Sequence, residues 1–299
     1  MASIIDLKKQ ITGIRSTRKI TKAVQLVAAS KMKQFQNQAV AVRGFASDLL
    51  AVLSAHAQAM TGSVYLDERS EGKTAFVLYS TDRGLCGPLN QQLFRHLTRS
   101  AEWNATPQEL RLLITIGKKG ADLCRVNGLA VHHAIADVPE RLTIRAAIEV
   151  VDQLLMMWEK ENISRVYMVV PHYKNSFTYI PLMKQFLPVS ESVLEAQIGA
   201  HPESFTGEIS VHPEGEAILE PDASAFTTKL VDQLVRTLFL QAMYELRASE
   251  FSSKMLAMQA ATDAANKILD LKTLAFNKLR QQKITQEIAE ITGARAALA

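Results

Sequence analysis

The last quarter of the sequence lacks the two residues that most strongly interrupt helices. No glycine and no proline occurs from Asp222 to Thr292, although the 299 residues include 13 glycines and 9 prolines. Apolar residues recur there three and four positions apart, as in Leu230, Leu234 and Leu238. The pattern predicts one helix, on the order of 100 Å long. Its own chain is too small to cover such a helix, so we expect another chain to cover part of it.

Other absences exclude whole classes of protein. Only two cysteines are present, Cys86 and Cys124, which argues against a disulfide framework and favours a reducing compartment. No apolar run approaches eighteen residues, so no transmembrane helix is expected. The first residues, Met1 to Asp6, resemble neither a signal nor a transit peptide. With 47% hydrophobic residues the chain has ample material for a folded core.

The net charge of +4 is unevenly distributed along the chain. Residues 1–60 carry nine basic residues against Asp6 and Asp48, whereas residues 61–221 are net acidic. A basic segment of this kind indicates an acidic partner, which could be nucleic acid, lipid or protein, or simply a solvated helix face.

Residues 1–60 contain a second long helical pattern. Starting from Leu7 and stepping four and then three residues to Leu53, eleven of fourteen positions are apolar. This spacing is typical of a coiled-coil seam, and Gly13 and Gly44 weaken the helix without ending it. The three polar positions are consecutive: Arg18, Thr21 and Gln25. Such a break either specifies register or faces another protein, and the natural partner of the seam is the C-terminal helix, packed antiparallel.

Between the two helices the period changes to that of an α/β domain, residues 70–190. Apolar runs predict strands at 75–80, 110–116, 129–135 and 165–170, alternating with helices near 88–103, 118–127 and 140–161. Residues 177–187 could add a strand, with Pro181 favouring an edge position. Glycines and prolines make residues 191–221 a connecting loop back to the C-terminal helix, residues 222–299. The predicted fold is an α/β domain inserted in a long antiparallel coiled coil of the N- and C-terminal helices.

Three short patterns could indicate a phosphate-binding loop, a metal site or a nucleophile, but a purely structural role is favoured for each. Gly117 to Gly120 lacks the spacing of a phosphate-binding loop and predicts a strand-to-helix turn. His132 and His133 have no further ligand at metal-site spacing, and adjacent strand side chains point to opposite faces. Cys86 lies between Gly84 and Gly87, which indicates a tight turn more than a nucleophile. We therefore predict no catalytic residue, no cofactor site and no metal site.

Three separated motifs together resemble the gamma subunit of F-type ATP synthases. The first runs from Ile20 to Met32 and the second from Ser80 to Asn90 (Ser-Thr-Asp-Arg-Gly-Leu-Cys-Gly-Pro-Leu-Asn). The third runs from Asn277 to Ile291 and is preceded by blocks at 248–250 and 257–263. The motifs occur in the family's order and span both ends and the middle of the chain. The resemblance implies paired long helices around a Rossmann-like insert.

The resemblance also implies a function without an active site. The chain would be the rotor shaft of a proton- or sodium-translocating ATP synthase, inside a hexamer of alpha and beta subunits. The insert would contact the epsilon subunit and the proteolipid ring, and only partners would hold the chain to the cytoplasmic face of the bacterial inner membrane. A shaft that contacts each catalytic site unequally would shift those sites among conformational states.

The resemblance assigns partner contacts to particular residues. Arg280 and Gln281 match positions that hydrogen-bond a catalytic subunit, and Thr285 and Glu287 lie in the same helical region. Residues of the first and last motifs that would face the hexamer are Arg18, Lys19, Lys22, Val24, Lys254, Arg280, Gln281, Thr285 and Glu287. Val24 replaces a common methionine, and Lys254 replaces an arginine, which keeps the charge and loses bidentate geometry. The motif within the insert comprises Ser80, Thr81, Asp82, Arg83, Gly84, Cys86, Gly87 and Asn90.

Two other classes of function remain open at this point. A nucleic-acid-binding coiled-coil protein would explain the basic N-terminal segment, although no base-reading motif is present. A nucleotide-using enzyme would use the α/β domain, although no phosphate loop supports it. The first would show salt-dependent retention on DNA, and the second would bind nucleotide as an isolated chain.

Overall fold

The computed structural model describes residues 3–55, 63–139, 143–175, 177–189 and 222–297. The predicted connecting loop, 191–221, lies outside these residues, as do the last five residues of the predicted helix 1–60. The chain forms two compact units, Met1–Ala29 with Lys254–Ala299 and Ser30–Ser253.

Both predicted long helices are confirmed. Helix α1 spans Ile4–Ala55, 52 residues, and α7 spans Ala223–Ala297, 75 residues. Neither Gly13 nor Gly44 interrupts α1, which is helical through both positions. A capping box begins α1: the Asp6 amide donates to Ser3 Oγ and the Ser3 amide to Asp6 Oδ2. The Asp222 carboxylate caps α7 by accepting from the Ala225 amide.

In the first unit, α1 and α7 run antiparallel, with Leu7, Ile11 and Ala28 buried on the predicted seam. The polar break in that seam is matched by polar groups of α7. Arg18 Nη1 donates to Asn266 Oδ1 at 3.2 Å, and the Thr21 and Thr262 hydroxyls lie 2.8 Å apart. Arg18 and Thr21 thus have partners within the chain.

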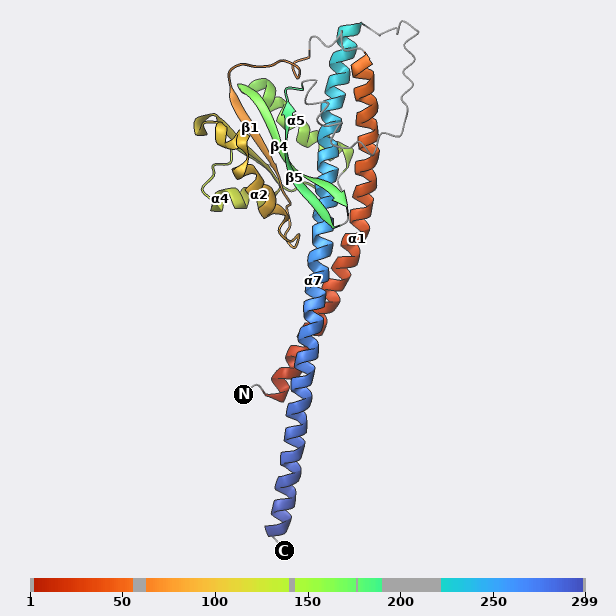
Figure 1. Ribbon diagram of the computed structural model, residues 1–299, viewed down its shortest axis with the longest axis vertical. Coiled ribbons are helices and arrows are strands. Elements are labelled where there is room, and N and C mark those ends of the chain that lie inside the picture. Colours follow the sequence, from red (N-terminus) through yellow and green to blue (C-terminus); the bar gives the residue numbers. More distant parts are fainter. Residues whose placement is uncertain (1–2, 56–62, 140–142, 176, 190–221, 298–299) are drawn as a thin grey trace. The chain divides into compact units, whose positions relative to one another are not determined.

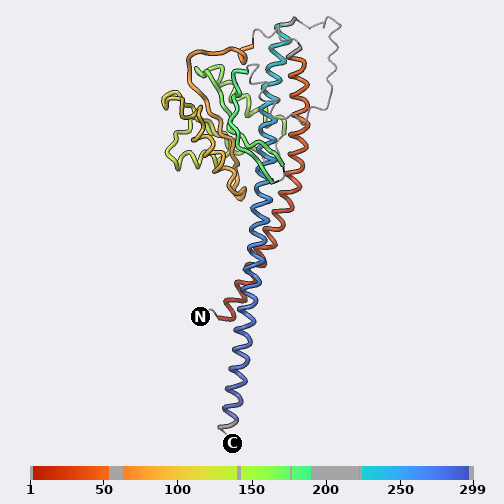
Figure 2. Tube along the Cα trace, viewed as in Figure 1, coloured from red at the N-terminus to blue at the C-terminus, as the bar shows by residue number. Residues whose placement is uncertain are grey.

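In the second unit the same two helices continue side by side (Figure 2). Phe35 stacks on Phe251, with ring centroids 5.6 Å apart, and Tyr244 lies against the same ring. The buried positions of α1 here are Met32, Phe35, Ala39, Ala46, Leu50 and Leu53. All lie on the predicted seam except Leu50, which is buried where the seam predicted Leu49. The antiparallel pairing follows from these contacts, since residues later in α1 meet residues earlier in α7.

A five-stranded sheet forms the α/β insert, which we define as the described residues 63–189 (Figure 1). Its strands are β1 (Lys73–Tyr79), β2 (Arg111–Ile116), β3 (His133–Ile135), β4 (Ile163–Asn175) and β5 (Thr178–Leu187). The spatial order is β3-β2-β1-β4-β5; the first four strands are parallel and β5 is antiparallel to β4. The helices are α2 (Leu89–Arg99), α3 (Ala101–Ala105), the short 3-10 helix η2 (Gln108–Leu110), α4 (Lys118–Val126) and α5 (Ile144–Lys160).

The strand and helix predictions for the insert hold with two corrections. The strand expected at 129–135 contains only His133–Ile135, because only these three residues pair with β2. The helix expected at 88–103 is divided at Ser100, whose extended backbone ends α2 and whose hydroxyl caps α3. Residues 177–187 form an edge strand as predicted, with Pro181 opposite Pro171.

Aromatic side chains fill both faces of the sheet. Tyr79 and Phe186 pack on Phe239 of α7, with ring centroids 5.7 and 6.1 Å away. On the opposite face Phe76 packs edge-on to Trp103 and stacks on Tyr167. Because residues 76 and 79 are three apart on a strand, they point to opposite faces. One face of the sheet is therefore covered by α7.

A buried charged cluster also joins the sheet to the helix pair. Glu245 of α7 accepts from Arg43 of α1 at 3.0 Å and from Gln241 at 3.0 Å, and lies 3.1 Å from His172 Nδ1 of β4. Lys184 of β5 lines the small cavity beside it, about 30 Å³ in volume. We call these five residues the Glu245 cluster.

Competing effects set the ionisation of this cluster. Burial alone would raise the pKa of Glu245, but hydrogen bonds from His172 and Gln241 and the charges of Lys184 and Arg43 lower it to about 2. Burial lowers the pKa of Lys184, and the Glu245 carboxylate partly offsets this effect. Glu245 therefore stays ionised wherever the fold persists near neutral pH.

Gly117→Ala is expected to destabilise the insert by about 3 kcal/mol, because two effects add. Gly117 has φ +94°, which side chains rarely adopt, and an added Cβ would overlap the Ser80 carbonyl. Urea unfolding followed by the fluorescence of Trp103 and Trp158 measures the effect within the insert. Gly44→Ala is the matched control, since its Cβ meets nothing within 4 Å. The free energy of unfolding of the control is expected to increase by about 0.5–1 kcal/mol, because alanine has the higher helix propensity. Equal effects of the two substitutions on the free energy of unfolding would contradict the prediction.

Glu245→Gln is expected to cost about 3 kcal/mol at pH 7, since it leaves the half-buried side chains of Arg43 and Lys184 without their carboxylate. The folded pKa of Glu245, about 2, lies below its ordinary 4.5. Its contribution is therefore complete above pH 4.5 and is lost as the pH falls toward 2. The free energy of unfolding is measured for wild type and variant from pH 7 to pH 2. The difference between the two should decrease over that range. Glu149→Gln, at an exposed ion pair with Arg145, should change stability by less than about 0.5 kcal/mol throughout; a gap for Glu245→Gln that does not change with pH would contradict the assignment.

Candidate functional site

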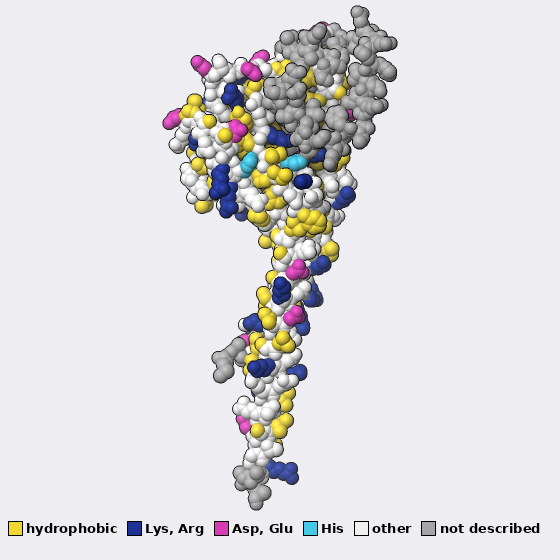
Figure 3. Space-filling model, in the orientation of Figure 1, with side chains coloured by type: hydrophobic (Ala, Val, Ile, Leu, Met, Phe, Trp, Pro, Cys, Tyr) yellow, Lys and Arg dark blue, Asp and Glu magenta, His cyan; other side chains and the backbone are white. Residues whose placement is uncertain are grey.

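The C-terminal end of α7 is not covered by any other described part of this chain. Every side chain from Gln281 to Arg295 is exposed, and Arg280 is exposed as well. Three isoleucines, Ile284, Ile288 and Ile291, are 48%, 57% and 69% exposed. Spacings of four and three residues place them on one side of the helix. In Figure 3 apolar side chains lie among polar and basic ones on the surface near the C-terminus.

The four residues that the sequence assigned to this end lie on that exposed surface. Arg280, Gln281 and Thr285 make no hydrogen bond recorded among the described residues, apart from those of the helix backbone. The Glu287 carboxylate forms a weak ion pair with Lys283, with Oε1 3.8 Å from Nζ. The structure thus brings these residues together on one free helix end and leaves their side chains available.

The N-terminal partner residues divide into two groups. Lys19 and Lys22 are exposed, and Lys22 Nζ lies 3.3 Å from Gln25 Oε1. Arg18 and Val24 are half-buried, and Arg18 is bonded to α7. Lys254 is half-buried too. Arg18 and Thr21 of the seam break bond α7, and contact of this segment with another subunit stays a prediction.

The motif from Ser80 to Asn90 ties together the carboxyl ends of three strands. Ser80 Oγ donates to the carbonyls of Ile116 and Gly117 and accepts from the Gly120 amide. Asp82 Oδ1 accepts from the amides of Lys118 and Asp137, 3.1 Å from each. These bonds connect β1 with the loops that follow β2 and β3.

The second half of the motif is a closed turn around Cys86. The thiol is 3% exposed and lies 3.3 Å from Asn90 Nδ2. The Asn90 side chain also accepts from the Thr81 amide and donates to the Thr81 hydroxyl. Leu85 and Gly87 have φ +65° and +55°. The predicted tight turn is present, and a buried thiol with these neighbours is no accessible nucleophile. Arg83 and Gly84 are exposed at its tip.

The turn from Gly117 to Gly120 is occupied by the protein's own acceptors. The amides of Lys118, Lys119 and Gly120 donate to Asp82 Oδ1, the Thr81 carbonyl and Ser80 Oγ. A phosphate at a helix N-terminus needs these first amides to be free. The predicted strand-to-helix turn is confirmed, and the first turn of α4 offers no phosphate cradle.

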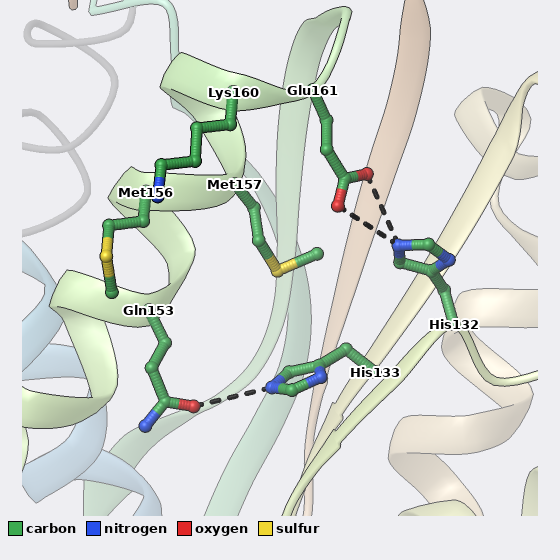
Figure 4. A pocket seen from close by; sticks show the side chains of 7 residues that line it. All are labelled: His132, His133, Gln153, Met156, Met157, Lys160 and Glu161. Carbon is green, nitrogen blue, oxygen red and sulfur yellow. Dashed lines mark hydrogen bonds and ion pairs between the residues drawn. The ribbon is translucent and has the colours of Figure 1, made fainter.

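The two adjacent histidines line one pocket of about 280 Å³ between β3 and α5 (Figure 4). His132 lies 3.2 Å from Glu161 Oε2, and His133 lies 3.4 Å from Gln153 Oε1. The expectation that their side chains point to opposite faces was wrong, because His132 precedes the strand. Among the described residues no three His, Cys, Asp or Glu side chains are placed to hold a metal ion.

Sequence reasoning missed the polar side chains through which α7 holds the insert. Arg247 Nη2 donates to the carbonyls of Val138 and Pro139, while Nη1 pairs with Glu250 at 2.8 Å. The Ser253 hydroxyl donates to the carbonyl of Cys86. All residues from Ala242 to Ser253 are buried. The signal was present as charged residues within an otherwise apolar helical stretch, whose partners the sequence alone does not identify.

No helix among the described residues has the length and apolar content required to cross a membrane.

Comparisons with known proteins agree on one family. A family model described as ATP synthase matches residues 3–298. The ATP synthase gamma chain of Psychrobacter arcticus is 34% identical over the full length of both chains. Those of Stenotrophomonas maltophilia K279a and Pelotomaculum thermopropionicum are 34% and 32% identical, also over the full length of both chains.

Solved structures share the fold. The rotor and central-stalk chains that match come from mitochondrial ATP synthases. One, from Euglena gracilis in rotational state 3, has a TM-score of 0.63 at 18% identity and covers 99% of this chain and 94% of that chain. Another, from the central stalk of Tetrahymena thermophila, has a TM-score of 0.57 at 24% identity, covering 81% and 99%. The match of the whole sequence to curated gamma chains, with this shared fold, shows that the chain belongs to the ATP synthase gamma-chain family, whose members form the rotor shaft of F-type ATP synthases.

Proposed function

We propose that the bare end of α7 and the exposed basic side of α1 are the surfaces through which this gamma subunit acts on the alpha and beta subunits. The observation that carries the proposal is the exposure of every side chain from Gln281 to Arg295. Three of the exposed isoleucines form a stripe on one side of the helix. Burying such a stripe is favourable at roughly 25 cal/mol per Å², so a surrounding apolar sleeve would stabilise it.

Differential contact is the mechanism by which this surface would work. The side chains around the helix end differ in chemistry, with an arginine, an amide, a hydroxyl and a carboxylate at Arg280, Gln281, Thr285 and Glu287. A rotating helix of this kind presents a different set of donors and acceptors to each catalytic subunit. A catalytic site changes its conformational equilibrium only to the extent that the rotor binds its conformations with unequal free energy. The asymmetry of the helix end therefore drives the interconversion of the catalytic sites.

The exposed lysines of α1 serve a second contact. Lys19 and Lys22 oppose acidic segments of the hexamer, and Val24 and Lys254 border the same region. Arg18 acts there chiefly by bonding Asn266, which fixes the adjacent turn of α7.

The α/β insert contacts the epsilon subunit and the proteolipid ring, and the chain has no catalytic role of its own. The occupied amides of the α4 turn and the buried thiol of Cys86 support this assignment. The chain is peripheral to the cytoplasmic face of the bacterial inner membrane and is held there by its partners. A nucleic-acid-binding role for the basic segment finds no support among the relatives.

Arg280→Ala is expected to lower proton-driven ATP synthesis about tenfold at normal assembly, the equivalent of one lost charge-assisted hydrogen bond. The measurement uses the complete enzyme reconstituted in vesicles, with subunit content checked on gels. Arg145→Ala removes an equally exposed arginine from the insert and should leave synthesis unchanged. Normal synthesis by the Arg280→Ala enzyme would remove Arg280 from the working surface.

The isolated chain is expected to bind ATP no more tightly than about 1 mM, because the amides that could cradle phosphate are already bonded. Isothermal titration calorimetry with MgATP, in the presence and absence of moderate salt, measures this. Saturable binding at micromolar concentration would contradict the non-catalytic assignment and revive a nucleotide site in the insert.

A further inference from the structure

One segment of α7 combines complete burial with an unusual number of polar side chains. All residues from Ala242 to Ser253 are buried, yet they include Glu245, Arg247 and Ser253. Burial of charged groups costs several kcal/mol each unless partners compensate. The partners of these three residues explain their presence.

Glu245 uses both carboxylate oxygens on groups from different elements. Oε1 accepts from Arg43 Nη2 of α1 and from Gln241 of α7, and Oε2 lies 3.1 Å from His172 Nδ1 of β4. Lys184 of β5 lines the cavity on the same side. One carboxylate therefore connects α7 to the other long helix and to the sheet.

Arg247 and Ser253 attach α7 to two further parts of the insert. Arg247 donates to the carbonyls of Val138 and Pro139, in the loop after β3, and Ser253 donates to Cys86, in the loop after β1. At 3.6 residues per turn, Arg247 and Ser253 leave the helix about 160° and about 80° from Glu245. The three attachments therefore surround the helix axis.

Apolar packing alone does not explain these groups. Hydrophobic contact is non-directional, and a buried ion pair adds little net stability compared with hydrophobic residues of similar size. Charge-assisted hydrogen bonds, in contrast, require particular distances and directions. What they add here is a defined rotational setting of α7 within the insert.

We infer that Glu245 is a positioning residue that, with Arg247 and Ser253, fixes α7 against twisting within the α/β insert, so that torque passes between the insert and the helix pair. The inference rests on the proposed rotor function. Its consequence is mechanical: weakening the Glu245 attachment softens the rotor at this point and leaves the partner-binding end of α7 unaltered.

The test measures torsional stiffness in the complete enzyme. Both natural cysteines are buried, so an added Arg99→Cys on the exposed face of α2 can carry a bead selectively. With the hexamer fixed to glass and stalled by a non-hydrolysable ATP analogue, the variance of the bead angle is inversely related to rotor stiffness. Assembly and urea unfolding are measured in parallel.

Arg43→Lys is the decisive variant, since it keeps the charge and loses the planar fork of the guanidinium. Its angular variance is expected to roughly double, because a flexible lysine ammonium does not hold the fixed direction of the Arg43 Nη2 bond to Glu245, while its unfolding midpoint changes little. Glu245→Gln should raise the variance further. Asp152→Asn is the matched control: it removes the more exposed ion pair between α5 and Arg236 of α7, and its variance should equal that of wild type.

Unchanged variance in both Arg43→Lys and Glu245→Gln would overturn the inference, as would an equal increase in Asp152→Asn. If Glu245→Gln does not assemble, Arg43→Lys and Gln241→Leu decide alone, the latter removing one hydrogen bond to Glu245. Absence of ATP-driven bead rotation in the wild-type enzyme would instead contradict the rotor function itself. The two failures are therefore distinguishable.

Discussion

The fold depends on how the apolar surface of α7 is covered, because no single domain can enclose a helix of 75 residues. Along Ala242–Ser253 the helix is covered on every side by the insert and α1. From Met258 to Leu269 only the side facing α1 is buried, and from Gln281 onward no side is. One uninterrupted helix therefore passes from a protein core to a fully exposed end, which we propose contacts other chains. This decrease in burial along α7, more than any cluster of side chains, separates structural residues from those proposed to be functional.

Within the covered segment, polar residues specify orientation where apolar residues supply most of the free energy. Met243 and Phe251 bury large apolar side chains there, as does Phe239 just before it, and such contacts alone would hold α7 against the sheet in several rotational settings. Glu245 tolerates one setting, since both its oxygens have partners on other elements. The cost of burying its charge is offset by these partners, which also hold its pKa near 2. The same logic applies to Arg247, whose donors reach two loop carbonyls.

The sequence predicted the elements better than their contacts. The absence of glycine and proline identified α7, and the seam from Leu7 to Leu53 identified α1, because period and breakers are local properties. The shortness of β3 was not predictable, since only His133–Ile135 pair with β2 and the apolar pattern does not show at which residue the pairing begins. Nor was the pairing of Thr21 with Thr262, because sequence shows that a position is polar but not which distant group matches it. The site at the end of α7 was placed by family resemblance, and its exposure follows from the length difference between the helices.

The motifs that reveal the family thus serve two different purposes. Ser80, Cys86 and Asn90 are turned inward and join strand ends to each other and to α7. Arg280 and its neighbours are turned outward, and among the described residues their side chains bond only other residues of the same helix end, as Lys283 does with Glu287. Coupling needs both, because unequal contacts at the helix end shift catalytic sites only if the angle of that end follows the angle of the insert. A rotor that twisted freely at the insert would average its contacts over several angles and lose the differences on which coupling depends. Under the proposed mechanism the inward residues contribute to the reaction by preserving an angle, and they need touch no substrate to do so.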